Sequence, residues 1–270
     1  MNRYRIPLLA VLLGAVCFLL RLFQNMTGFE ADTGLPVRGN VPALALTVLL
    51  PLAALALALL ARRADAEGEG VSFSAFFGSD ERRALAVVVA GAFLMALSGV
   101  WELSSRGAAT VLSADGMTVV RASSASLTLL TGVLSLVSAA CLLSVLPLCK
   151  KDAAQGSRAT VLLAVPLCLV VRLIVLYRAF SVDPILAGYC VELLCVVFLT
   201  LGFYRLSSFA VRAGRARLFT FYVAFSVVLA LTLLADGLSA AGIFGLGGAL
   251  ALLGFLLLHL TRREETEPAE

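Results

Sequence analysis

The sequence predicts an all-α integral membrane protein with eight transmembrane helices and both termini in the cytoplasm. Three observations predict this fold class. Hydrophobic residues make up 61% of the 270 residues and charged residues only 14%, whereas a typical soluble domain is about half apolar and a quarter charged. The apolar residues fall into blocks long enough to cross a bilayer, and the basic residues gather in alternate loops.

Each apolar block is about 17–22 residues long, which at 1.5 Å per residue crosses a hydrocarbon core of roughly 30 Å. A lipid-exposed segment must satisfy its own backbone hydrogen bonds, and no block alternates like a barrel strand, so we expect helices. In chain order the predicted spans are Ile6–Met26, Val41–Ala61, Ala84–Trp101, Leu127–Leu148, Ala159–Tyr177, Ile185–Tyr204, Leu218–Asp236 and Ala240–Leu260.

Charged and turn residues mark the ends of these spans. The first span follows the basic stretch Met1–Arg5, and because no small-x-small cleavage site comes after it, we expect an uncleaved helix and not a signal peptide. Pro184 marks the start of the sixth span. A charged tail, 263–270, follows the eighth span and carries no lipidation motif.

The distribution of basic residues predicts the orientation, because short cytoplasmic loops are enriched in Lys and Arg. With the N-terminus inside, fifteen of the 21 basic residues lie on the inner side, and the formal charge of +4 mostly reflects this bias. We therefore expect a lipid bilayer and not nucleic acid as the partner of these charges. The inner set is Arg3, Arg5, Arg62, Arg63, Arg82, Arg83, Lys150, Lys151, Arg158, Arg205, Arg212, Arg215, Arg217, Arg262 and Arg263.

Two loops are longer than the others. The predicted cytoplasmic loop Arg62–Arg83 joins "RRADAEGEG" to the aromatic "VSFSAFFG"; a solvated linker is the leading interpretation, with membrane-interface contact or partner docking as alternatives. The predicted external loop Leu103–Ser126 contains "TVLSADGMTVV", in which Asp115-Gly116 separates β-branched runs. This pattern indicates either a small hairpin or a disordered loop.

The two halves of the chain share short matching segments. "CFLLRL" (Cys17–Leu22) in the first span matches "CLVVRL" (Cys168–Leu173) in the fifth. The third and seventh spans each lie between an arginine and an acid at the same spacing. These matches raise the hypothesis of a parallel four-plus-four repeat, with halves 1–150 and 151–262, inside one transmembrane domain, 1–270. Accidental matching of Leu- and Ala-rich helices is the alternative.

Arg172 stands in the middle of the fifth span, where an arginine costs about 2.5–3.5 kcal/mol on insertion scales and needs a partner or water. Counting from the tight turn to the sixth span puts Arg172 about 9 Å and Glu192 about 12 Å deep, so we expect these two to pair. Tyr189 lies three residues before Glu192 on the same helix face. The leading interpretation is a structural pair that fixes the hairpin. In the alternative, Arg172 and Arg21 bind an anionic group in an outward-facing polar cavity.

Four further charges lie at the predicted outer mouth. Arg178 and Asp183 are placed to form a second, shallower pair. Glu102 and Asp236 end the third and seventh spans, where we expect interfacial anchors, with cation binding or proton coupling as the alternative. The proposed mates for Arg21 are Glu30, Asp32 and Glu102.

Sequence motifs argue against an enzyme. His259 is the only histidine, and the chain has neither H-E-x-x-H nor a G-x-x-x-x-G-K-[ST] loop. "GLSAAG" lacks the G-x-S-x-G spacing. We therefore predict no catalytic residues, no metal site and no cofactor, and we interpret the six cysteines as packing residues.

Three segments carry a resemblance to a family: "LLRLFQNMTG" in the first span, "YRAFSVDPILAGY" after the fifth, and "YRLSSFAVRAGRARLF" before the seventh. On these segments the chain resembles a group of uncharacterised multi-span membrane proteins of clostridia and related gut bacteria. The resemblance covers most of the chain and is strongest from the fifth to the seventh span. It implies a bacterial cytoplasmic membrane and no particular activity.

The sequence leaves two functional hypotheses. The leading hypothesis is a small transporter-like or solute-binding protein with an outward-facing polar cavity around Arg21, Arg172, Tyr189 and Glu192, taking a small anionic ligand. The rival is a non-transporting membrane subunit or sensor that meets a membrane or cytoplasmic protein partner through its cytoplasmic loops, Arg62–Arg83 and Arg205–Arg217.

Overall fold

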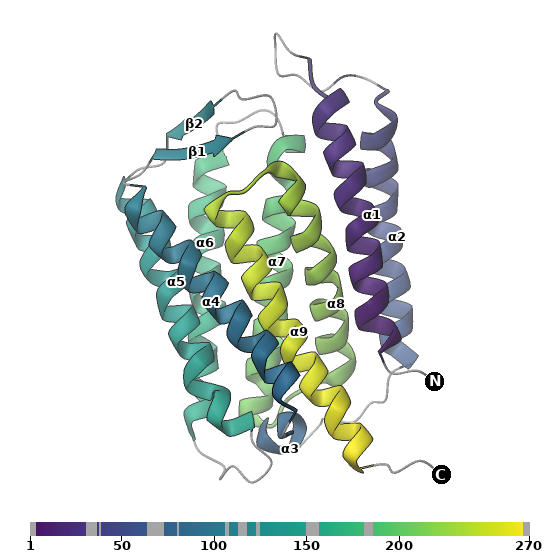
Figure 1. Ribbon diagram of the computed structural model, residues 1–270, viewed down its shortest axis with the longest axis vertical. Coiled ribbons are helices and arrows are strands. Elements are labelled where there is room, and N and C mark those ends of the chain that lie inside the picture. Colours follow the sequence, from purple (N-terminus) through teal and green to yellow (C-terminus); the bar gives the residue numbers. More distant parts are fainter. Residues whose placement is uncertain are drawn as a thin grey trace.

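A computed structural model gives the fold of the chain, and eight of its helices are long and apolar enough to cross a membrane, which confirms the predicted eight-span all-α architecture (Figure 1). The chain ends visible in Figure 1 lie at the same end of the bundle, as an even number of spans requires. The structure describes residues 4–30, 37, 39–63, 73–79, 81–105, 108–112, 118–122, 125–149, 157–180 and 186–266.

The spanning helices follow the apolar blocks closely. They are α1 (Arg5–Thr27), α2 (Val41–Arg63), α4 (Arg82–Ser104), α5 (Ala125–Val145), α6 (Ala164–Phe180), α7 (Leu186–Ser208), α8 (Ala216–Leu233) and α9 (Ala240–Thr266). Short 3₁₀ segments extend four of them: η1 (Leu146–Cys149), η2 (Ser157–Leu163), η3 (Phe209–Val211) and η4 (Leu234–Asp236).

Two helix ends differ from the prediction for local reasons. The fifth span begins as the 3₁₀ segment η2 and becomes α-helical only at Ala164, next to Pro166, whose ring nitrogen cannot donate the backbone bond that an α-helix needs there. α9 continues to Thr266, six residues beyond the predicted end of the apolar block at Leu260, because arginine and glutamate are good helix formers outside lipid.

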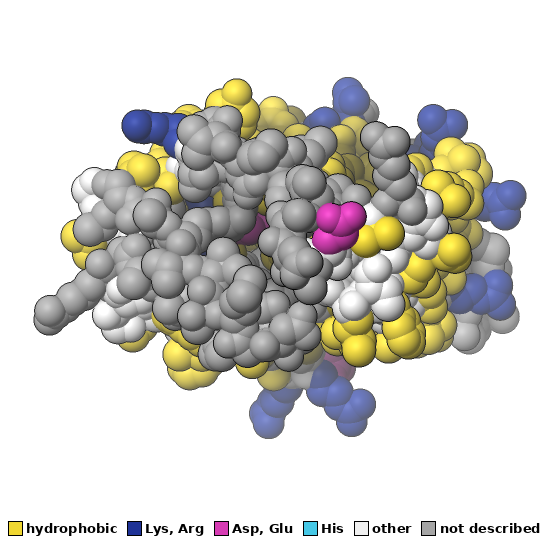
Figure 2. Space-filling view, turned by 90° about the horizontal axis from the view of Figure 1, so that it is seen from above, with side chains coloured by type: hydrophobic (Ala, Val, Ile, Leu, Met, Phe, Trp, Pro, Cys, Tyr) yellow, Lys and Arg dark blue, Asp and Glu magenta, His cyan; other side chains and the backbone are white. Residues whose placement is uncertain are grey.

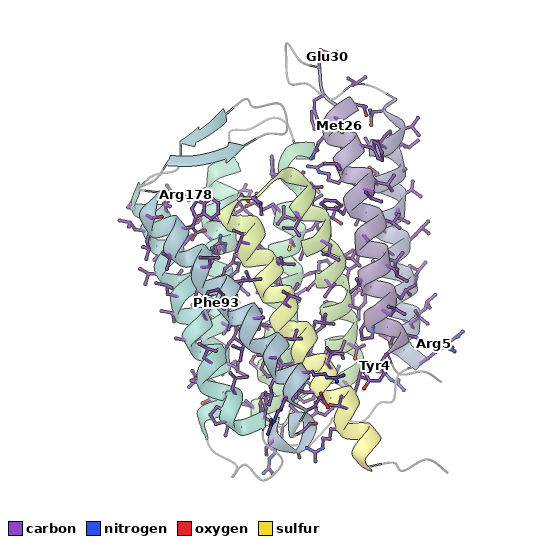
Figure 3. The ribbon with its side chains drawn as sticks, viewed as in Figure 1. Tyr4, Arg5, Met26, Glu30, Phe93 and Arg178 are labelled. Atoms are coloured by element: carbon purple, nitrogen blue, oxygen red, sulfur yellow. The ribbon has the colours of Figure 1, made fainter. Side chains whose placement is uncertain are left out.

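The helices α4 to α9 form the body of the bundle, and the hairpin of α1 and α2 lies along α8 at one side (Figure 1). We call the end of the bundle where α1 and α4 finish the predicted outer end, and the opposite end the predicted cytoplasmic end. Met26 and Glu30 lie at the predicted outer end and Tyr4 and Arg5 at the other (Figure 3).

Glycines bring α4 into backbone contact with both of its main neighbours. A Cβ on Gly91 would lie 2.4 Å from the Ala251 nitrogen and 2.5 Å from the Gly247 oxygen of α9. A Cβ on Gly99 would lie 2.8 Å from the Gly132 oxygen of α5. Only small residues permit such close helix packing in a membrane. The α4–α9 and α4–α5 interfaces therefore fix the positions of side chains one turn further along each helix.

The aromatic part of the loop Arg62–Arg83 is folded into the bundle, so the prediction of a solvated linker is wrong for this part. Phe73–Phe77 forms the short helix α3, in which the three phenylalanines are buried. Phe76 stacks on His259 with ring centroids 3.8 Å apart. Arg262 Nη1 also donates to the Ser74 oxygen at 2.6 Å. The burial of six phenylalanine side chains outweighs the exposure that the neighbouring charges predict; they are Phe73, Phe76, Phe77, Phe209, Phe219 and Phe255.

The loop between α4 and α5, predicted to be external, contains the hairpin that was one of its two predicted forms. Strands β1 (Ala108–Leu112) and β2 (Thr118–Ala122) pair antiparallel, with Thr110 opposite Val120. The predicted turn at Asp115-Gly116 lies outside the described residues. The hairpin sits over the predicted outer end of the bundle, above α4 and α6 (Figure 1).

The four-plus-four repeat stays a prediction. The hairpins α1–α2 and α6–α7 correspond in position along the chain, but their surroundings differ. α1 packs on α2 and α8, whereas α6 packs on α5 and α7.

Candidate functional site

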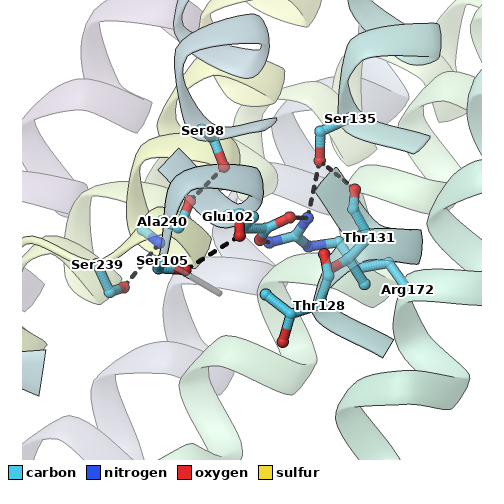
Figure 4. Close-up of polar contacts among 10 residues, drawn as sticks. Ser98, Glu102, Ser105, Thr128, Thr131, Ser135, Arg172, Ser239 and Ala240 are labelled. Carbon is cyan, nitrogen blue, oxygen red and sulfur yellow. Dashed lines mark hydrogen bonds and ion pairs between the residues drawn. The ribbon is translucent and has the colours of Figure 1, made fainter. Parts of the chain in front are cut away.

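The buried arginine of the fifth span is paired with a carboxylate of the third. Arg172 lies in the half of its span nearer the predicted outer end and is 8% exposed. Its Nη2 donates to Glu102 Oε1 at 2.5 Å, and its Nη1 donates to Glu102 Oε2 at 3.3 Å. Glu102 belongs to the last turn of α4 and is also 8% exposed. The two side chains point toward one another between these helices (Figure 4). Two hydrogen bonds to one carboxylate make this a strong, charge-assisted contact.

Two more helices complete the surroundings of Arg172. Its Nη1 also donates to Ser135 Oγ on α5 at 3.0 Å, and Ser135 in turn donates to the Thr131 oxygen at 2.8 Å. On the remaining side, the guanidinium carbon lies 4.2 Å from the ring centroid of Phe244 on α9, within the range of a cation–π contact. Four helices therefore meet at one guanidinium group.

Helix packing explains why these residues converge. Glu102 and Ser135 each lie three residues after a glycine of the close α4–α5 contact, Gly99 and Gly132, so both face the same space one turn further along. Ser98 Oγ donates to the Ala240 oxygen at 2.7 Å, which holds the first turn of α9 against α4. Phe244 follows one turn after Ala240 and so reaches the guanidinium.

The prediction that Arg172 pairs with Glu192 is wrong. Glu192 and Tyr189 lie on α7 and are half-buried, but the described contacts of Arg172 go to α4, α5 and α9. The estimate from the sequence used only the depth of each residue along its helix. It could not give the direction of the side chain around the axis of α6, and that direction decides the partner.

Arg21 is held by a second ion pair, with an acid that was not among its predicted mates. Its Nε donates to Asp236 Oδ1 at 2.6 Å and its Nη2 to Asp236 Oδ2 at 3.2 Å. Nη1 donates to Gln24 Oε1 at 3.1 Å, and Asn25 Nδ2 donates to Asp236 Oδ1 at 2.9 Å. Asp236 lies in η4, so this pair fastens α1 to the end of α8.

The structure does not gather the predicted site into one cavity. α1, which carries Arg21, and α6, which carries Arg172, lie on different sides of α8 (Figure 1). Glu102 and Asp236 were expected as interfacial anchors, with cation binding or proton coupling as the alternative. Each is the counter-charge of one buried arginine, and the alternative stays a prediction.

The second predicted pair, Arg178 with Asp183, lies partly outside the described residues. Arg178 is exposed near the predicted outer end of α6 (Figure 3). Asp183 is not among the described residues. The Arg178–Asp183 pair therefore stays a prediction.

Viewed from the predicted outer end, acidic side chains are visible near the middle of the face, and most Lys and Arg side chains lie around its edge (Figure 2). Among the described residues, no three His, Cys, Asp or Glu side chains converge in a way that holds a metal ion.

One signal in the sequence pointed to the observed pairs. The third and seventh spans each end in one acid, and the first and fifth each contain one arginine. The observed pairs join the first span to the seventh and the fifth to the third. Both observed pairs were therefore among the combinations that the sequence allowed, together with those that use Glu192 in the sixth span.

The chain was compared with protein-family models, with curated protein sequences and with solved structures. No match was found in any of the three comparisons.

Proposed function

We propose that this polytopic membrane protein is a transporter-like or solute-binding protein of a bacterial cytoplasmic membrane, with an outward-facing polar site centred on Arg172 and Glu102. The observation that carries the proposal is the bidentate Arg172–Glu102 pair, buried where four helices meet. The localisation rests on the resemblance to clostridial membrane proteins. The ligand class is a small anionic solute that approaches from the predicted outer end.

The energetics of the pair favour a binding role over a purely structural one. Burying two opposite charges costs several kcal/mol per ion in desolvation, and well-packed apolar residues often stabilise a core equally well. Glu102 also sits at the C-terminal end of α4, where the helix dipole disfavours a carboxylate. Glu102 therefore does not stabilise α4. It supplies the negative charge that allows an arginine to be buried in an apolar bundle, where the arginine can bind a ligand.

Tyr189 and Glu192 remain proposed members of the wall of this site, because α7 packs directly on α6. Arg21 is not part of the site in this proposal. Its pair with Asp236 joins α1 to α8 and serves as the structural counterpart of the Arg172 site.

The rival hypothesis, a subunit or sensor that acts through cytoplasmic loops, has less support. The aromatic residues of the loop Arg62–Arg83 are buried against α9 and η3, and so are not offered to a partner. The basic loop Arg205–Arg217 is the remaining support for that hypothesis. Basic residues in a cytoplasmic loop are already expected from the topology of a membrane protein, so they do not indicate a partner.

A thermal-shift screen of the purified protein against anionic, neutral and cationic metabolites tests the proposal. We expect an anionic compound to raise the unfolding temperature of the wild type and of Arg21→Lys, but not of Arg172→Lys. Arg21→Lys is the matched control, because it makes the same change in the other buried pair. If no anion stabilises the wild type more than Arg172→Lys, the proposed site is wrong.

A further inference from the structure

We propose that the ligand of the Arg172 site is a carboxylate, bound to the unused edge of the guanidinium together with one proton on Glu102. This inference rests on the proposed function and adds the chemical class of the ligand and the ion that accompanies it. Three features of the described residues carry it: the donor geometry of Arg172, the same geometry at Arg21, and the charge balance of the site.

The first feature is the edge of Arg172 that remains available. A guanidinium has five N–H donors in a rigid plane. Glu102 accepts one hydrogen bond from Nη1 and one from Nη2, at the end of the guanidinium. Ser135 accepts from the second hydrogen of Nη1. The Nε hydrogen and the second Nη2 hydrogen remain, and these two point in the same direction. Among the described residues, Arg172 Nε has no hydrogen-bond acceptor.

This edge is not sealed inside the protein. In the described part of the chain, Arg205 Nε is the one side-chain nitrogen or oxygen that is fully buried without a hydrogen-bond partner. The Nε of Arg172 therefore keeps some accessible surface, although the residue as a whole is only 8% exposed. An unpaired donor in such a position is costly unless water or a ligand accepts from it.

The second feature is the geometry of Arg21, which shows what fits this edge. At Arg21 the edge formed by Nε and Nη2 is filled, because the two oxygens of Asp236 accept from these two nitrogens at 2.6 and 3.2 Å. A planar group with two oxygens and one charge is therefore the partner that the same edge of Arg172 can take. Phe244 covers one face of the guanidinium, so the ligand must arrive in its plane. A planar carboxylate meets that requirement better than a tetrahedral phosphate.

The third feature is charge. Arg172 and Glu102 together are neutral, so a bound carboxylate would leave one uncompensated negative charge where little water reaches, which is strongly unfavourable. One proton taken up from water onto Glu102 restores neutrality, and the protonated acid can still accept from the guanidinium through its other oxygen. When the carboxylate leaves, this proton returns to water and the Arg172–Glu102 pair forms again.

The helices around Glu102 offer few other groups for this proton. α5 contributes Ser135 and α9 contributes Phe244, neither of which titrates. In the half of α6 nearer the predicted outer end, the ionisable residues are Arg172 and the exposed Tyr177 and Arg178. On α7, Tyr189 and Glu192 are half-buried, and Glu192→Gln is the variant that distinguishes its carboxylate from that of Glu102.

Isothermal titration calorimetry on the purified full chain in detergent tests the inference. The probes are sodium benzoate, sodium butyrate and sodium acetate, with sodium phosphate, sodium sulfate and sodium chloride as comparison anions. Titration of benzoate in two buffers with different ionisation enthalpies measures the proton uptake. We expect a carboxylate to bind with uptake of about one proton near pH 7, so that the affinity rises about tenfold for each unit by which pH falls.

Variants assign the two partners. Glu102→Gln is expected to bind the carboxylate without proton uptake and without pH dependence. Asp236→Asn, in the other buried pair, is expected to keep both, and Glu192→Gln is expected to keep the proton uptake. Arg172→Lys is expected to lose binding at least tenfold. The pH dependence of the wild type alone still tests the inference if Glu102→Gln does not fold.

The failures of the inference and of the proposed function differ. Binding that depends on Arg172 but prefers phosphate or sulfate, or carboxylate binding without proton uptake, overturns the inference and leaves the solute site in place. If no anion, carboxylates included, binds in a way that depends on Arg172, both the inference and the proposed function are wrong.

Discussion

Two buried arginines meet two carboxylates in this bundle, and the two pairs are built differently. Arg21 offers its Nε and Nη2 edge to Asp236, while Arg172 offers its Nη1 and Nη2 end to Glu102. The first pair leaves a carboxylate side chain 23% exposed at the rim; the second buries both side chains to about 10% exposure. The first fastens a peripheral hairpin to the bundle, and the second lies where four helices converge.

The difference teaches that the presence of an ion pair does not by itself decide between a structural and a binding role. The edge of the guanidinium that the carboxylate occupies decides whether a second acceptor fits. At Arg21 the preferred bidentate edge is filled, and Gln24 takes a further donor. At Arg172 that edge has no acceptor among the described residues.

The largest expected effect comes from removing each arginine. Arg172→Ala leaves Glu102 buried without a counter-charge, so we expect a loss of about 3–5 kcal/mol in the free energy of unfolding. Arg21→Ala should cost less, about 1–3 kcal/mol, because Asp236 already reaches the rim and can be hydrated. Unfolding in mixed detergent micelles measures both values. Equal losses would show that the two sites do not differ in burial.

Moving α4 away from α9 should damage one site and spare the other. Gly91→Ala places a methyl group 2.4 Å from the Ala251 nitrogen, so α4 must shift, at a cost of about 1–3 kcal/mol. The shift displaces Glu102 and weakens its pair with Arg172, while the pair between α1 and η4 is unaffected. The measurement is the further loss in the free energy of unfolding that Arg172→Ala or Arg21→Ala causes when it is added to Gly91→Ala.

Ala90→Leu, on the exposed face of the same helix, is the control for this variant. It should change neither pair. If Gly91→Ala weakens the two pairs equally, α4 is not what positions the Arg172 site.

Ser135→Ala removes one of the acceptors of Arg172 Nη1. We expect a loss of about 1 kcal/mol in the free energy of unfolding, since a donor of the buried guanidinium is left unpaired. Ser138→Ala is the matched control, because Ser138 is buried on the same helix and donates to the Leu134 oxygen, away from Arg172. A larger loss in the control than in Ser135→Ala would contradict the role given to Ser135.

The smallest expected effect is at the Arg21 pair. Asn25→Ala removes the amide that donates to Asp236 Oδ1 and to the Ala235 oxygen, and we expect a loss of about 0.5 kcal/mol, because the partly exposed Asp236 can accept from water instead. The free energy of unfolding checks this value. A loss above that of Ser135→Ala would mean that the Arg21 pair is the more tightly built of the two.

The sequence predicted the eight spans and the two arginines that need partners, but not the partners themselves. Span positions follow from apolar length, and depth follows from helical rise, and both are local properties of the chain. The position of Glu102 beside Arg172 depends on the glycine contacts of α4 with α5 and α9, which join residues far apart in sequence. Glu192, the acid of the next span along the chain, was therefore the wrong choice.

The loop before α4 shows the same limit at the opposite end of the bundle. Its charges predicted a solvated linker, and its phenylalanines were visible in the sequence. Their burial depends on Phe209, Phe219 and Phe255, which come from three later segments of the chain. Only the folded bundle brings these rings together.

A double-mutant cycle between the fifth and third spans tests the central claim, that Glu102 and not Glu192 neutralises Arg172. The single variants are Arg172→Met, Glu102→Gln and Glu192→Gln. The two double variants combine Arg172→Met with Glu102→Gln or with Glu192→Gln. The free energy of unfolding is measured for each. We predict a coupling of at least about 1.5 kcal/mol between Arg172 and Glu102 and less than about 0.5 kcal/mol between Arg172 and Glu192. A strong coupling to Glu192 with none to Glu102 would contradict the site described above.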